Sequence, residues 1–72
     1  MDLEIQKIRE KVRKIVSEYS EYESDDDILA LDSMNFLEMF YFLENEFGIN
    51  LECRFELNTV EKITRYIVTH EV

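Results

Sequence analysis

Three groups of side chains in the 72-residue sequence could do chemistry, and the acidic run Asp25-Asp26-Asp27 is the first. Such carboxylates could bind calcium, but an EF-hand loop needs alternating ligands, a central Gly and a Glu at its twelfth position. Counted from Asp25, the twelfth position is Phe36. We therefore expect the three aspartates to form a solvated acidic loop and no metal site.

The second group is Cys53, the only cysteine, and His70. A thiol site would need the two residues to be oriented as a pair, and nothing in the sequence does so. A single cysteine excludes an intrachain disulfide and a zinc cluster, and it fits a reducing, cytoplasmic setting. We expect His70 to interact with the last carbonyl groups of a helix. No catalytic constellation is present, so an enzyme is not predicted.

The third group begins at Asp32-Ser33, directly before a segment with helical spacing of apolar residues. Both residues are good N-caps, because a short side-chain oxygen accepts hydrogen bonds from the free amides of a first helical turn. Ser33 could thus be an ordinary capping serine. One face of this helix carries Met34, Glu38, Tyr41 and Asn45. A Met and a Tyr interleaved with Glu are typical of a docking surface, although a wide core-facing arc would give the same pattern.

Three helices are predicted to position these residues, at about 2–18, 33–47 and 59–69. Gly48 stands where a left-handed C-cap favours glycine, and Asn58 with Glu61 has the spacing of a capping box. We expect Ile28, Leu29 and Leu31 to pin the first loop to the core. In the link 49–57 we expect the same of Leu51, Phe55 and Leu57, with room for one short extra helical turn within 50–57. The sequence predicts one all-α domain, 1–72, because one Gly and no Pro leave few tight turns for strands.

The charge is unevenly distributed along the chain, whose formal net charge is −9. Residues 1–16 sum to +2, residues 17–56 to −11 and residues 57–72 to zero. The acidic middle disfavours nucleic acid, whose phosphates select Lys and Arg, and it predicts partners with basic surfaces. We expect the Lys and Arg face of the first helix to be solvated. No apolar run is long enough for a membrane span, and a membrane role is not expected.

Several motifs of the chain resemble the acyl carrier protein family. They are Leu31-Asp32-Ser33-Met34, Phe36-Leu37-Glu38 and the helix end Leu43-Glu44-Asn45-Glu46-Phe47-Gly48-Ile49. That family has an Asp-Ser-Leu/Met motif at the start of its second helix, an acidic residue five places after the serine, and a Glu/Phe-rich helix end. Asn58-Thr59-Val60 with Ile63 and Tyr66-Ile67 is similar to its last helix. The resemblance covers about residues 3–70 and implies an acyl-carrier-like helical bundle.

The resemblance implies that Ser33 carries a 4′-phosphopantetheine arm whose thiol holds acyl or aminoacyl groups as thioesters. A phosphopantetheinyl transferase would activate the hydroxyl, since no His or Lys of this chain is a credible base. Asp32 matches the motif aspartate, which we assign to capping and to recognition by the transferase. A helix N-terminus favours the phosphodiester through free amides and the helix dipole.

By the same resemblance, the partners are the transferase, a loading enzyme and downstream biosynthetic enzymes. Met34, Glu38 and Tyr41 would contact them, with Asn35 and Asn45 nearby, and Glu44 and Glu46 would steer their approach. We expect a stand-alone, monomeric, cytoplasmic carrier. An acidic helical adaptor that is never modified, and that binds proteins through the Met34/Glu38/Tyr41 face, is the alternative.

Three departures from the family pattern bear on the cargo. Ala30 stands where many members have glycine, Asn35 replaces an acid common in fatty-acid carriers, and the link 49–57 is short. Bulky Phe36, Phe40 and Phe47 predict a filled interior that would not shelter a long acyl chain. Short acyl or aminoacyl units in a specialised pathway are therefore expected.

Overall fold

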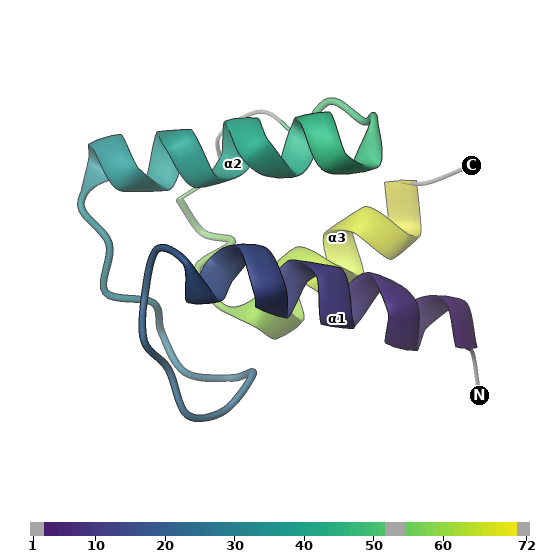
Figure 1. Cartoon of the computed structure of the whole chain (residues 1–72), viewed down its shortest axis with the longest axis horizontal. Helices are drawn as coiled ribbons and strands as arrows, with labels where there is room; N and C mark the ends of the chain where they lie inside the picture. Colours follow the sequence, from purple (N-terminus) through teal and green to yellow (C-terminus); the bar gives the residue numbers. More distant parts are fainter. Residues whose placement is uncertain (1–2, 52–54, 71–72) are drawn as a thin grey trace.

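The computed structural model describes residues 3–51 and 55–70, which hold three helices and no strand. The helices are α1 (Leu3–Ser17), α2 (Ser33–Phe47) and α3 (Val60–His70). α1 and α2 run in opposite directions, and α3 packs mainly against α1 (Figure 1). The all-α prediction and the three helix positions are confirmed to within two residues. The extra turn expected in 50–57 falls partly on residues 52–54, outside the described residues; of the remainder, 55–56 form a turn that belongs to no helix.

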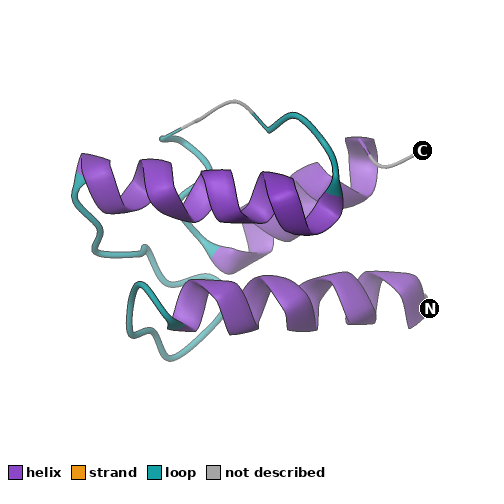
Figure 2. Cartoon of the chain, turned by 45° about the horizontal axis from the view of Figure 1, so that its top comes forward, coloured by secondary structure: helices purple, strands orange, loops and turns teal. Residues whose placement is uncertain are grey.

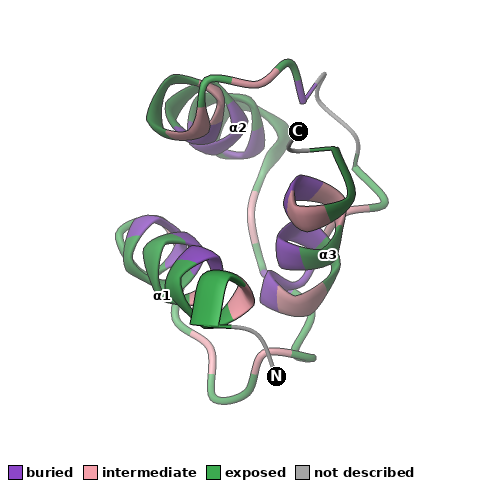
Figure 3. Cartoon of the chain, turned by 90° about the vertical axis from the view of Figure 1, so that its right-hand side faces the viewer, coloured by how far each residue is buried: buried purple, intermediate pink, exposed green. Residues whose placement is uncertain are grey.

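The apolar stripe of α1 forms one wall of the core. Ile8, Val12, Ile15 and Val16 are buried, as their i, i+4, i+7 spacing predicts. All three helices turn their buried sides toward the centre of the molecule (Figure 3). The rest of the core comes from the other helices and two linking segments: Leu29, Phe36, Met39, Phe40, Leu43, Leu51, Val60, Ile63 and Ile67.

Both ends of α2 have the cap that the sequence predicts. The Oδ1 atom of Asp32 accepts a hydrogen bond of 2.8 Å from the amide of Asn35, which satisfies one free donor of the first turn. Gly48 has φ 67° and ψ 29°, and its amide donates to the carbonyl of Glu44. A residue with a side chain is strained in this conformation, which explains glycine at the helix end.

The start of α3 differs from the prediction. Thr59 is the capping residue, because its Oγ1 accepts a hydrogen bond of 3.0 Å from the amide of Lys62. The expected capping box between Asn58 and Glu61 was wrong: the Glu61 carboxylate is bound by Arg9 instead, at 3.0 and 3.2 Å.

Two of the residues expected to pin the loops are exposed. Ile28 is 73% exposed and Phe55 is 56% exposed, whereas Leu29 and Leu51 are buried, as expected, and anchor these segments. Leu31 and Leu57 are half-buried against the core.

Candidate functional site

Ser33 is the first residue of α2 and is exposed. Its neighbour Asp32 lies just outside the helix in an extended conformation, with φ −77° and ψ 171°. The Asp32 carboxylate occupies the amide of Asn35, while the first amides of the helix have no carbonyl one turn earlier to bind. Within 3–51 and 55–70 the Ser33 hydroxyl takes part in no hydrogen bond. The hydroxyl is therefore free, at the positive end of the helix dipole.

Figure 2 shows that α2 begins at the end of a long loop and at the far end of the molecule from the first turn of α1. This places Ser33 at a tip, where a partner can approach it without displacing a helix. Among the residues described, no His or Lys is hydrogen-bonded to Ser33.

The outward face of α2 is apolar as well as acidic. Met34 is 73% exposed, Tyr41 68% and Leu37 51%. Glu38 and Asn45 are exposed on the same side. Because Phe36, Met39, Phe40 and Leu43 already fill the core side, the Met34/Glu38/Tyr41 face is a solvent-facing surface, and the alternative of a wide core-facing arc was wrong.

The two acids at the end of α2 have partners within the chain. An oxygen of Glu44 accepts a hydrogen bond of 3.0 Å from the amide of Leu51, which fixes the start of the link after α2. Glu46 lies 3.6 Å from the ammonium group of Lys11 on α1. Asn35, expected near the docking surface, is exposed and gives its amide to the Asp32 cap.

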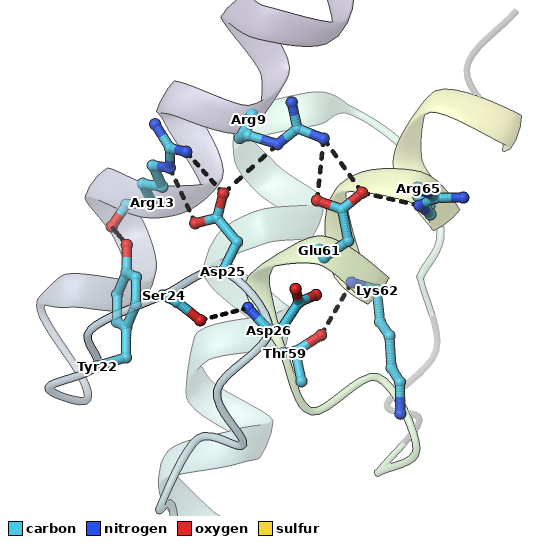
Figure 4. A network of polar contacts seen from close by, with 10 residues as sticks. All are labelled: Arg9, Arg13, Tyr22, Ser24, Asp25, Asp26, Thr59, Glu61, Lys62 and Arg65. Carbon is cyan, nitrogen blue, oxygen red and sulfur yellow. Dashed lines mark hydrogen bonds and ion pairs between the residues drawn. The ribbon is translucent and has the colours of Figure 1, made fainter.

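Asp25 is the centre of an ion network that joins the first loop to two helices (Figure 4). Its carboxylate accepts hydrogen bonds of 3.0 and 2.6 Å from Arg13. Arg9 Nε lies 3.7 Å from Asp25 Oδ2, an ion-pair distance too long for a hydrogen bond. Arg9 also binds Glu61 of α3, which Arg65 holds from the other side at 2.8 Å. We call these five residues, Arg9, Arg13, Asp25, Glu61 and Arg65, the clamp.

The clamp changes the acidity of its carboxyl groups. Its hydrogen bonds from Arg13 hold the pKa of Asp25 below the ordinary value of 3.8. The hydrogen bond from Arg65, helped by Arg9, holds the pKa of Glu61 below 4.5. Burial opposes both shifts, so the attraction to the arginines outweighs the loss of hydration.

The expected solvation of the acidic loop holds for Asp26 and Asp27, whereas Asp25 is half-buried. Asp25 and Asp27 also have structural roles. Asp27 accepts hydrogen bonds from the amides of Glu23 and Ser24, at 2.9 and 3.0 Å, which lower its pKa. Asp26 is exposed, as expected. No group of three His, Cys, Asp or Glu in the described part of the chain is arranged to hold a metal ion.

The expectation that the basic face of α1 is solvated holds for Arg13, which is exposed although it binds Asp25, and was wrong for Arg9, which is half-buried. Arg9 and Arg13 are four residues apart and therefore share a face of α1, but this spacing alone does not show that they meet another element. The acidic partner could not be identified from sequence, because the first loop has no periodicity.

The other candidate residues of the sequence were His70 and Cys53. His70 Nδ1 is 2.9 Å from the carbonyl oxygen of Tyr66 in the last turn of α3, as expected. Its ring also stacks on that of Tyr66, with centroids 4.0 Å apart. Cys53 lies outside the described residues.

Comparisons with known proteins add no relative to this picture. The chain matches no protein-family model, and the comparisons with curated proteins and with solved structures gave no significant match. None of the helices described is long and apolar enough to cross a membrane.

Proposed function

We propose that this chain is a stand-alone, monomeric carrier protein of the cytoplasm, holding biosynthetic intermediates as thioesters on a 4′-phosphopantetheine arm attached to Ser33. The observation that carries the proposal is the free, exposed hydroxyl at the first position of α2, next to the Asp32 cap. The acyl-carrier motif Leu31-Asp32-Ser33-Met34 supports it from the sequence.

Attachment of the arm is a transfer from coenzyme A. The oxygen of Ser33 attacks the phosphorus that bears the pantetheine, and a new O–P bond forms. The pyrophosphate bond breaks, and adenosine 3′,5′-bisphosphate leaves with its electrons. The serine proton passes to a base of the phosphopantetheinyl transferase, because no described His or Lys of this chain is hydrogen-bonded to Ser33. The free amides and the dipole of α2 then stabilise the phosphodiester.

The carrier does no bond chemistry of its own in this proposal. The arm raises the effective concentration of the cargo at the loading enzyme and then at each downstream enzyme. Those enzymes would dock on Met34, Glu38 and Tyr41, and basic groups on them would be attracted by the acidic middle of the chain.

A short acyl or aminoacyl cargo is supported by the aromatic packing on the core side of α2. The rings of Phe36 and Phe40 stack with centroids 5.0 Å apart, and Phe55 packs against Phe36 at 5.1 Å. A long acyl chain would have to separate these rings to enter the bundle at this point. Large NMR shifts of the core methyl groups on loading a long chain would contradict a short cargo.

The test of the carrier function is the intact mass of the protein after incubation with coenzyme A and a broad-specificity phosphopantetheinyl transferase. We expect one gain of about 340 Da, the mass of the arm. Ser33→Ala removes the gain, while Ser20→Ala, which alters a serine of the first loop, keeps it. A wild-type protein that gains no mass would contradict the proposal.

The second candidate is an unmodified acidic adaptor. The exposure of Met34 and Tyr41 favours it, because a docking face serves an adaptor as well as a carrier. The mass experiment separates the two, since an adaptor gains no arm and loses nothing in Ser33→Ala.

A further inference from the structure

The first loop is fastened to the start of α3 by its backbone. The carbonyl of Asp25 accepts a hydrogen bond of 3.0 Å from the amide of Glu61, a free donor in the first turn of α3. Four residues on, the amide of Leu29 donates to the carbonyl of Asn58 at 2.9 Å. The start of α3 therefore holds the loop at two points, and the loop in turn caps α3.

The side chain of Asp25 fastens the same residue to α1. Its two hydrogen bonds from Arg13 and its contact with Arg9 reach across from the helix that precedes the loop. Arg9 also binds the Glu61 carboxylate (Figure 4). The amide of the same Glu61 donates to the carbonyl of Asp25. Asp25 is thus the one described loop residue tied to α1 by its side chain and to α3 by its backbone.

These contacts affect the position of Ser33, because only three residues lie between it and Leu29, the second residue bonded to the start of α3. Leu29 is buried, and the chain reaches the Asp32 cap three residues later. A loop fixed at Asp25 and Leu29 restricts the positions that the start of α2 can adopt. If the loop were released at Asp25, Ser33 could occupy more positions, and a partner that binds one of them would pay a larger entropic cost.

We infer that the clamp is a positioning device: α1 and α3 together hold the first loop at Asp25 and so fix where Ser33 is presented. Asp25 is then a positioning residue, which acts on Ser33 through the loop. The effect on modification of Ser33 rests on the proposed function, whereas the fastening of the loop to α3 does not.

Amide hydrogen exchange, measured by NMR on the full chain, tests the fastening directly. In Asp25→Asn we expect exchange at Leu29 and Glu61 to accelerate about tenfold, because a charge-assisted pair is lost. Amides of the buried stripe of α1 should keep their rates. The matched control is Asp26→Asn. It removes one negative charge from the next residue, whose side chain is exposed, and should leave the exchange rates of Leu29 and Glu61 unchanged.

Two further readouts keep the inference falsifiable. Adding Arg13→Gln to Asp25→Asn should accelerate exchange little beyond Asp25→Asn alone, since both changes break the same pair. With the transferase, Asp25→Asn should raise the apparent KM for the carrier about threefold and leave kcat nearly unchanged, because fewer molecules present Ser33 correctly.

Equal acceleration in Asp25→Asn and Asp26→Asn would overturn the inference. A uniform acceleration of exchange over all three helices in Asp25→Asn would also overturn it, because the clamp would then contribute only to the overall stability of the fold. If wild-type protein is not modified at all, the proposed function fails, and the exchange rates still decide whether the loop is clamped.

Discussion

At the scale of single residues, Asp32 and Ser33 differ in their roles at the start of α2: Asp32 caps the helix and Ser33 is its first residue. The Asp32 carboxylate accepts a hydrogen bond from the amide of Asn35 and caps the helix that begins at Ser33, whose hydroxyl makes no hydrogen bond among the residues described. The same cap gives the first turn its fixed geometry. Ser33 is therefore an exposed residue on an ordered turn, which under the proposed function would cost a transferase little reorganisation on binding.

The capping role of Asp32 can be separated from any role in recognition. We expect Asp32→Ala to lower the free energy of unfolding by about 1 kcal/mol, since one amide loses its acceptor. Asp32→Ser should restore most of that loss, because its hydroxyl can accept the same bond. Urea denaturation followed by circular dichroism measures both. If the Ala and Ser variants are equally stable, the cap is not what Asp32 contributes.

At the scale of elements, much of the arrangement follows from local patterns. The stripe of α1, the Asp32 cap and the Gly48 end were predictable, because each depends on residues within one or two turns. The role of Glu61 at the start of α3 was not predictable from local sequence. Its carboxylate binds Arg9, which is 52 residues away in the sequence. The exposure of Tyr41 was equally undecidable, because it depends on where the other helices pack.

The clamp predicts a particular loss of stability in acid. The lowered pKa values of Asp25 and Glu61 mean that, below their ordinary values of 3.8 and 4.5, the unfolded chain binds protons that the folded chain does not. Their contribution is present above about pH 4.5 and is lost as the pH falls through the folded pKa values. We expect unfolding free energies from pH 7 to pH 3 to fall less steeply for Asp25→Asn than for wild type.

Asp26→Asn is the control for this acid series, because the exposed Asp26 side chain makes no ion pair among the residues described. Its curve should run parallel to that of wild type. Parallel curves for Asp25→Asn and wild type would show that the pair with Arg13 adds no acid-sensitive stability.

At the scale of the whole molecule, a small core supports an exposed working face. The described chain measures 32 × 26 × 19 Å, with a radius of gyration of 11.1 Å. A domain of this length is stabilised by only about 4–11 kcal/mol. The buried side of α2 supplies its part of the core, whereas Met34, Leu37 and Tyr41 on its outer side are exposed.

Two leucines of α2 test this division. Leu43 is fully buried, and Leu43→Ala should cost about 3 kcal/mol through lost burial and a cavity, a large part of the total. Leu37 is 51% exposed, and Leu37→Ala should change stability by less than about 0.5 kcal/mol. Urea denaturation compares the two identical truncations. Similar costs would mean that the outer side of α2 is part of the core.

The central claim, that the free hydroxyl at the start of α2 accepts a prosthetic arm, is tested most directly by peptide-mapped tandem mass spectrometry. The protein is incubated with coenzyme A and the transferase, digested and sequenced in the spectrometer. The account predicts a phosphopantetheine group on Ser33 in the peptide that carries Leu31-Asp32-Ser33-Met34. An unmodified Ser33, or an arm on Ser17, Ser20 or Ser24 in its place, would contradict it.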